Sequence, residues 1–141
     1  MNNSIQYTAK TAAFTLIFLC VSAAAFGQVF NRQIDSVSQK MERNGTWTEW
    51  IEWVDIDIAV NIDLANMVFR MSGNKAHDNI FKSIDAPEKM DADDSTYFIF
   101  RCTDSNNEKC KFVIGTYKDG GMRIIVEYEH SITMYNMVKE E

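Results

Sequence analysis

The clearest pattern in the chain is the alternation of apolar and polar residues from position 54 to position 64. Every even position in this stretch is apolar. The odd positions read Asp55, Asp57, Ala59, Asn61 and Asp63. Because successive side chains of a strand point to opposite faces, this period of two predicts a half-buried β-strand. We expect a bulge to bend this strand near its middle.

The same alternation marks several later segments as strands. They are NMVFRMS (66–72), TYFIFRC (96–102), KFVIGTY (111–117), MRIIVEY (122–128) and ITMYNMV (132–138). The acidic segment 84–95 has no period and contains the one proline, so we expect it to be the longest loop. The pattern predicts an all-β fold, an antiparallel meander of about seven or eight strands. A sheet of this length closes as a small barrel or folds as a sandwich, and the pattern leaves both open.

Residues 30–43 fit two patterns. Phe30, Ile34, Val37 and Met41 have the spacing of a helical stripe. The same stretch runs into Asn44-Gly45, a strong hairpin signal, and then pairs with residues 46–52. That hairpin places Lys40 opposite Glu49 and Glu42 opposite Trp47. We favour the strand.

Two turns predict the register of the second half. A hairpin around Ser105-Asn106-Asn107 sets Cys102 opposite Cys110 as a non-hydrogen-bonded pair. It also pairs Phe100 with Phe112, Phe98 with Ile114 and Arg101 with Lys111. We expect Asp104 and Glu108 to offset the last, like-charged pair.

A second turn, centred on Gly120, pairs residues of the following strands. It predicts the pairs Thr116–Ile124, Ile114–Val126 and Phe112–Tyr128. The two turns agree on one apolar face across three strands, which supports the meander.

The N-terminus has the features of a secretory signal peptide. Lys10 precedes an uncharged apolar stretch from Thr11 to Phe26, and Ala25 and Gly27 are small residues at the expected cleavage positions. We expect cleavage after Gly27, which leaves one domain over residues 28–141, exported to the periplasm or the extracellular space. An uncleaved anchor is disfavoured because a spanning helix needs roughly 18 to 20 apolar residues. No stable membrane span is then expected after cleavage.

Charge restricts the partners of the mature chain. The signal peptide carries one of the 14 basic residues, so 13 basic residues face 20 acidic ones. Nucleic acid and anionic membranes need a cationic surface, so this balance argues against both.

The two cysteines of the mature chain, Cys102 and Cys110, are predicted to form a disulfide. An exported protein is oxidised, and the hairpin register sets the two residues opposite each other. A metal site needs more ligands than the two histidines provide, and a redox pair favours a C-x-x-C spacing.

Several of these features together resemble a known group of proteins. They are Gly45, Trp47 and Trp50 in G-x-W-x-x-W, Phe100, Cys102 and Asp104 in F-x-C-x-D, and the final Met134-Tyr135-Asn136. With the Ile/Asp strand and the glycine turn before IIVEY, the chain over about residues 34–138 resembles small secreted, mostly uncharacterised all-β proteins of Bacteroidetes-type bacteria. The resemblance implies an exported bacterial β domain and favours a strand at 34–43. It implies no activity, cofactor or catalytic residue.

Four groups of residues are candidates for a site. The acidic segment 84–95 is a candidate contact for a cation or a partner, and a solvated connection explains it as well; its acidic residues are Asp85, Glu88, Asp91, Asp93 and Asp94. Trp47, Trp50 and Trp53 suggest a recognition surface that stacks on sugars or binds an apolar ligand, although two of them could instead pack into the core or line a barrel mouth. Regular strand alternation would place Trp50 on the face opposite to the other two. Asp55, Asp57 and Asp63 are weak calcium candidates, because alternate strand residues lie too far apart to share one ion without a second segment such as the loop with Asp91, Asp93 and Asp94. A solvated strand face explains the three aspartates equally well. His77 and His130 each read as an isolated surface histidine.

These observations favour a non-enzymatic exported domain that binds a protein partner or a small apolar ligand, without a cofactor. A structural domain of the cell envelope, without a ligand pocket, is the alternative. A small hydrolase is a remote third possibility, because no nucleophile or acid pair stands out.

Overall fold

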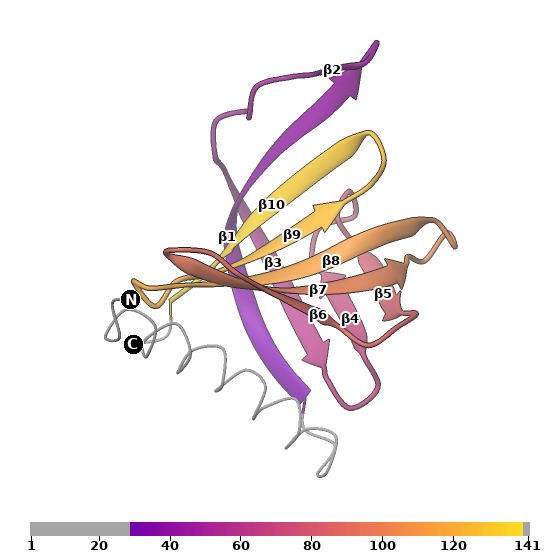
Figure 1. The fold of residues 1–141 in the computed structure, drawn as a ribbon, viewed down its shortest axis with the longest axis vertical. Coiled ribbons are helices and arrows are strands. Elements are labelled where there is room, and N and C mark those ends of the chain that lie inside the picture. The colour runs from indigo at the N-terminus through magenta and orange to yellow at the C-terminus, as the bar shows by residue number, and fades with distance from the viewer. Residues whose placement is uncertain (1–28, 140–141) are drawn as a thin grey trace.

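The computed structural model describes residues 29–139, which form ten β-strands and no helix (Figure 1). The strands are β1 Val29–Arg43, β2 Thr46–Trp47, β3 Val54–Asp63, β4 Val68–Ser72, β5 Asn79–Ser83, β6 Glu88–Asp91, β7 Ser95–Thr103, β8 Lys109–Tyr117, β9 Met122–Glu127 and β10 Ser131–Met137. The predicted signal peptide lies outside the described residues. Within residues 29–139, no helix is long and apolar enough to cross a membrane.

The strands form a closed antiparallel barrel. The hydrogen-bonded order is β10-β9-β8-β7-β5-β4-β3-β1, and β1 pairs with β10 to close it. β2 and β6 are added outside this ring, on β1 and β7. The all-β meander is therefore confirmed, and closure as a barrel resolves the choice that the sequence left open.

The strand interpretation of residues 30–43 is also confirmed. β1 pairs with β3 along residues 29–37 and with β10 along residues 34–41, so one long strand belongs to two ladders. Both registers shift between Ile34 and Ser36. Over these two residues β3 advances three positions, from Ile58 to Asp55, whereas β10 advances one. β3 therefore carries a bulge, as expected, but it lies between Asp55 and Ile58, in the first half of the strand rather than at its middle.

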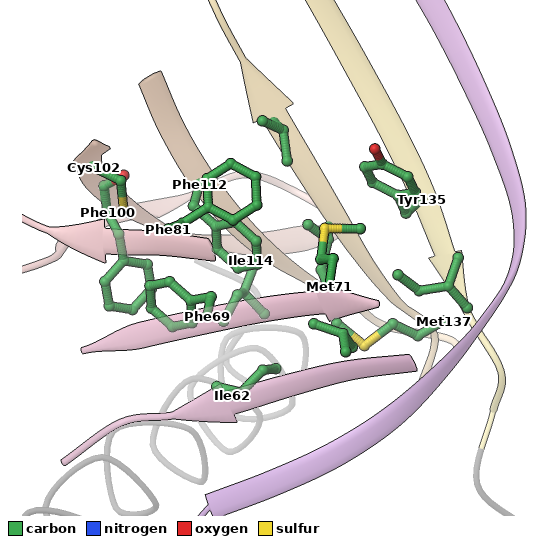
Figure 2. Packing of buried hydrophobic residues seen from close by; sticks show 14 of the residues in the cluster. Ile62, Phe69, Met71, Phe81, Phe100, Cys102, Phe112, Ile114, Tyr135 and Met137 are labelled. Carbon is green, nitrogen blue, oxygen red and sulfur yellow. The ribbon is translucent and has the colours of Figure 1, made fainter. Parts of the chain in front are cut away.

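Buried phenylalanine rings form one group within a core that is otherwise mostly aliphatic (Figure 2). Phe69 stacks on Phe112 with ring centres 4.4 Å apart and meets Phe100 edge-on at 4.7 Å. Phe81 lies 5.2 Å from Phe112. All four phenylalanines are buried, so this part of the interior is a packed core that leaves no ligand chamber between the rings.

The predicted β7–β8 register is confirmed, including the pairs Cys102–Cys110 and Arg101–Lys111. The acidic residues that offset the repulsion between Arg101 and Lys111 are not the predicted Asp104 and Glu108. Arg101 forms a 2.6 Å ion pair with Asp85, and Lys111 lies opposite Glu127 of β9. Asp104 instead accepts hydrogen bonds inside the turn, so it is not available to Arg101.

The predicted β8–β9 register was wrong by two residues. Phe112 pairs with Val126, Ile114 with Ile124 and Thr116 with Met122. The turn is centred on Asp119 rather than on Gly120, because the amide of Tyr117 bonds the carbonyl of Gly121. A shift of two keeps every side chain on its face, so the apolar surface is unchanged.

Two short strands escaped the sequence analysis. β5 carries one buried apolar residue, Phe81, and β6 lies inside the segment 84–95 that was predicted to be a loop. β5 and then β6 pair with the same edge of β7. All four residues of β6 are exposed, so the strand has no buried face and its sequence shows no alternation.

Candidate functional site

The segment between β2 and β3 follows β1 in an irregular way. The amide of Thr48 bonds the carbonyl of Met41, the amide of Ile51 bonds that of Gln39, and Val54 lies opposite Val37. The segment therefore advances three residues for every two of β1. For every two residues of β1, the segment contains one extra residue, as in a β-bulge. Side chains three positions apart in the segment therefore point the same way.

This three-residue step explains the spacing of the tryptophans. We call residues 47–53, which carry Trp47, Trp50 and Trp53, the tryptophan ridge. The ammonium group of Lys40 lies 5.5 Å from the ring centre of Trp47 and 5.0 Å from that of Trp50, so both rings lie on one side of β1. The predicted alternation was wrong, because the bulges replace the period of two. The predicted Lys40–Glu49 pair is absent for the same reason, since the β1–β2 ladder ends at Trp47.

Hydrogen bonds fix the ridge to the outer face of the barrel. The buried Ser38 hydroxyl donates a 2.7 Å hydrogen bond to the carbonyl of Ile51. The Thr48 hydroxyl accepts a 3.0 Å bond from the amide of Met41. In Figure 1 the hairpin of β1 and β2 extends beyond the neighbouring strands, so the start of the ridge projects from the barrel.

The last tryptophan meets a second cation. The guanidinium of Arg123, on β9, lies 5.5 Å from the ring centre of Trp53 and 5.1 Å from that of Tyr117. Tyr117 in turn contacts Tyr97 edge-on at 6.1 Å. Burial and the hydrogen bond with Tyr97 raise the pKa of Tyr117 to about 12, so the phenol stays neutral.

Gly115 makes room for these two tyrosines. A Cβ atom at this position would lie 3.1 Å from the Tyr97 ring and 3.2 Å from the Tyr117 hydroxyl. The ring of Tyr97 therefore covers the glycine, and the aromatic surface continues from the ridge over β8 and β7.

The ridge is exposed. Trp47, Trp50 and Trp53 keep 39%, 39% and 43% of their surface accessible, and Ile51 and Val54 each keep 52%. Single exposed apolar residues are common, but five within eight positions form a patch of the kind that marks a recognition surface.

A hollow of about 540 Å³ adjoins this surface. Arg123 and Tyr117 line it together with Asp35, Asn136 and Asp119. A hydrogen-bond chain crosses three strands along its wall. Arg123 Nε donates to Asn136 Oδ1 at 2.8 Å, Asn136 Nδ2 donates to Ser36 Oγ at 3.1 Å, and Ser36 Oγ donates to Asp35 Oδ1 at 3.0 Å.

A second hollow, of about 480 Å³, lies where β7, β8 and β9 meet the turn between β7 and β8, and the buried Cys102 and Cys110 line it together with Arg101 and Lys111. Its charged side chains oppose each other: Asp85 holds Arg101, and Glu127 lies opposite Lys111. No exposed aromatic ring lines it apart from the half-buried Tyr128.

Cys102 and Cys110 are buried free thiols on opposite strands. The Asp104 amide bonds the Glu108 carbonyl, so alternation along the ladder makes Cys102–Cys110 a hydrogen-bonded pair rather than the expected non-hydrogen-bonded one. Such pairs have Cα atoms about 5.5 Å apart, which is within the range of disulfides. Burial raises the pKa of Cys102 to about 11 and that of Cys110 to about 12.

The calcium candidates do not converge. Asp55 is exposed, Asp57 accepts a hydrogen bond from Gln33, and Asp63 binds the amide and side chain of Asn66 at 3.1 and 2.9 Å. Within residues 29–139, no group of three or more His, Cys, Asp or Glu side chains is placed to hold a metal ion. In the acidic segment, Asp85 pairs with Arg101 and Asp94 with Lys118.

His77 is not the isolated surface residue that was expected. Its Nδ1 lies 2.8 Å from the hydroxyl of the buried Tyr135, and its ring contacts that of Tyr135 edge-on at 5.6 Å. Burial lowers the pKa of His77, although Asp78 partly opposes the shift. His130 is exposed, with Glu42 and Glu129 each 3.7 Å away.

Comparison of the chain with protein-family models, with curated proteins and with solved structures gives no significant match. The functional argument therefore depends on the surface and its chemistry.

Proposed function

We propose that this protein is an exported, non-enzymatic binding domain that recognises its partner through the tryptophan ridge. The observation that carries the proposal is the exposure of three tryptophans along the bulged segment, two of them beside Lys40 of β1 and the third beside Arg123 of β9. Trp and Tyr are the residues most enriched at binding surfaces, because they bury a large area with few rotatable bonds.

The packed core favours an external partner over a ligand held inside the barrel. The rings of Phe69 and Phe81 pack against that of Phe112 inside the barrel, with ring centres 4.4 and 5.2 Å apart. Of the two ligand classes expected from the sequence, a small apolar ligand therefore finds no support between these rings. A partner that approaches from outside meets the ridge directly.

The alternative, a purely structural envelope domain, gives no reason for the ridge. The exposed rings contribute little to the core, and exposed apolar surface favours unwanted association. An oxidised Cys102–Cys110 pair belongs to our proposal, because it suits an exported protein and the register sets the two residues opposite each other.

The test compares three immobilised proteins: wild type, the double variant Trp50→Ala/Trp53→Ala, and the control Ile80→Ala. Ile80 lies on β5 and is as exposed as Trp50, at 39%. Each is exposed to an envelope extract of the cells that make the protein, and the retained protein and carbohydrate are quantified. We expect wild type and the control to retain the same material and the double variant to lose it.

Equal retention by all three proteins would overturn the proposal. Protection of the tryptophans from acrylamide quenching would do so as well, because a recognition surface must be accessible to solvent.

A further inference from the structure

We infer that the partner of the tryptophan ridge is a neutral saccharide chain, which runs along the ridge and enters the hollow beside Arg123. This inference rests on the proposed function and names its ligand class. Four features carry it: the continuity of the surface, the polar chain in the hollow, the balance of charge and the placement of cations between rings.

The ridge and the hollow are continuous through one side chain. Arg123 lies against Trp53 on one side, against Tyr117 on the other, and lines the hollow itself. Successive tryptophans are two β1 residues apart, which corresponds to about 7 Å along the strand. A ligand that repeats along its length meets equivalent rings at successive steps and then reaches the hollow.

The wall of the hollow offers fixed donors and acceptors. The side-chain oxygen of Asn136 accepts a hydrogen bond from Arg123, and its side-chain nitrogen donates one to Ser36. The Ser36 hydroxyl donates in turn to Asp35. Fixed groups lose little conformational freedom on binding. A hydroxyl group both donates and accepts hydrogen bonds, so an array that alternates donors and acceptors suits a polyhydroxylated ligand.

The charges in the hollow cancel. Arg123 and Lys139 face Asp35 and Asp119, and Lys139 lies 3.6 Å from Asp119. An anionic ligand would be attracted by the two cations and repelled by the two carboxylates, and a cationic ligand would meet the reverse. An apolar ligand would remove four charged groups from water without compensation. A neutral polar ligand avoids both costs.

The aromatic rings suit the faces of sugar rings. The C–H bonds on such a face carry partial positive charge, and the face of an aromatic ring is negative, so the two attract as a ring and a cation do. A protein partner fits Lys40 less well, because lysine is depleted at protein interfaces. Here Lys40 and Arg123 each lie between two aromatic rings.

The experiment titrates the intact mature protein with oligosaccharides and follows tryptophan fluorescence and heat. The neutral probes are linear hexasaccharides of glucose, xylose, mannose and N-acetylglucosamine, and the charged probe is a sulfated hexasaccharide. The variants are Trp53→Ala for the ridge, Asn136→Ala for the hollow and Ile80→Ala as the control. Circular dichroism and melting confirm that each variant is folded.

We expect at least one neutral hexasaccharide to bind and to change the tryptophan emission. Trp53→Ala and Asn136→Ala should each weaken binding by about tenfold or more, and Ile80→Ala should leave it unchanged. Binding of the sulfated probe alone, or neutral binding that neither variant weakens, would overturn the inference.

The extract experiment separates the two levels of the proposal. If no hexasaccharide binds while the extract still yields a protein that depends on the ridge, the ligand class is wrong and the binding function stands. If neither probe nor extract yields ridge-dependent binding, both are wrong.

Discussion

The hydroxyl of Tyr128 donates a 2.7 Å hydrogen bond to Oδ2 of the buried Asp104, and this bond joins the end of β9 to the turn between β7 and β8. Burial by itself would raise the pKa of Asp104. Hydrogen bonds from Tyr128 and from the amides of Glu108 and Asn106 outweigh burial and lower it.

Replacing Tyr128 by Phe should therefore destabilise the barrel. A hydrogen bond to a charged group contributes about 1.5 to 3 kcal/mol, and the variant leaves Asp104 with one bond fewer. The stabilisation is present above the ordinary carboxyl pKa and is lost as pH falls through the lowered pKa of the folded state. Urea unfolding should show a smaller difference between wild type and variant at pH 3 than at pH 7. A double-mutant cycle with Asp104→Asn should give a coupling energy, and strict additivity would contradict the assignment.

The pair Cys102–Cys110 should stabilise the domain once it is oxidised. The bridge closes a short loop, so the entropic model gives about 2 to 3 kcal/mol, less any strain. We expect the oxidised wild type to melt above the reduced protein, and the Cys102→Ala/Cys110→Ala variant to melt at the same temperature with and without reductant. Identical melting of wild type under both conditions would mean that no stabilising bridge forms.

Phe112 should be among the most sensitive positions of the core. It is fully buried, stacks on Phe69 and lies 5.2 Å from Phe81, so truncation leaves a large cavity. Phe112→Ala should cost about 3 to 5 kcal/mol. Ile80→Ala, on the outer side of β5, should stay within about 0.5 kcal/mol of wild type. Chemical denaturation measures both, and a small effect at Phe112 would argue against the packed interior.

His77 should make stability depend on pH near neutrality. Its pKa is lowered in the folded state because burial favours the neutral ring. The neutral ring therefore adds stability above the ordinary histidine pKa of about 6.5, and this stability is lost as pH falls through the lowered pKa. Melting temperatures at pH 7.5 and pH 5.5 should differ more for wild type than for His77→Asn. An equal difference in both proteins would assign the pH dependence to other groups.

Ser38 should control the order of the tryptophan ridge. Its buried hydroxyl holds the Ile51 carbonyl, and Ser38→Ala removes that bond without touching a tryptophan. Loss of one buried bond costs about 1 kcal/mol. Hydrogen exchange should become faster at residues 48–53 while the β7–β8 ladder keeps its protection. Uniformly faster exchange over the whole barrel would show that the bond supports the fold rather than the ridge.

The hairpin of β7 and β8 shows what local sequence is able to predict. Its alternating residues and the Asn107 turn define one register, because a slip of one residue would expose Phe98, Phe100 and Phe112 to water. The next hairpin was predicted on the correct face but two residues out of register. A shift of two keeps the same face, so burial does not distinguish the two registers and the turn geometry decides.

The candidate site was predicted only in part. The three tryptophans are visible in the sequence, and their spacing of three was a signal, since it fits neither a regular strand nor a helix that faces one way. Arg123, Asn136 and Tyr117 showed no such signal. They lie on β8, β9 and β10, far from Trp53 along the chain, and only the pairing of β1 with β10 brings them to the ridge.

The sequence by itself determined the all-β class, the inner faces of the main strands and the facing cysteines. These follow from side-chain alternation and short turns, which act between near neighbours. Tertiary structure alone decided closure into a barrel, the edge strand β6, the bulged course of residues 48–53 and the meeting of Trp53 with Arg123. Each of these four features depends on β1 or β7 pairing with more than one other strand. Some of those strands are distant in the sequence, so no local pattern of residues predicts how they all pair.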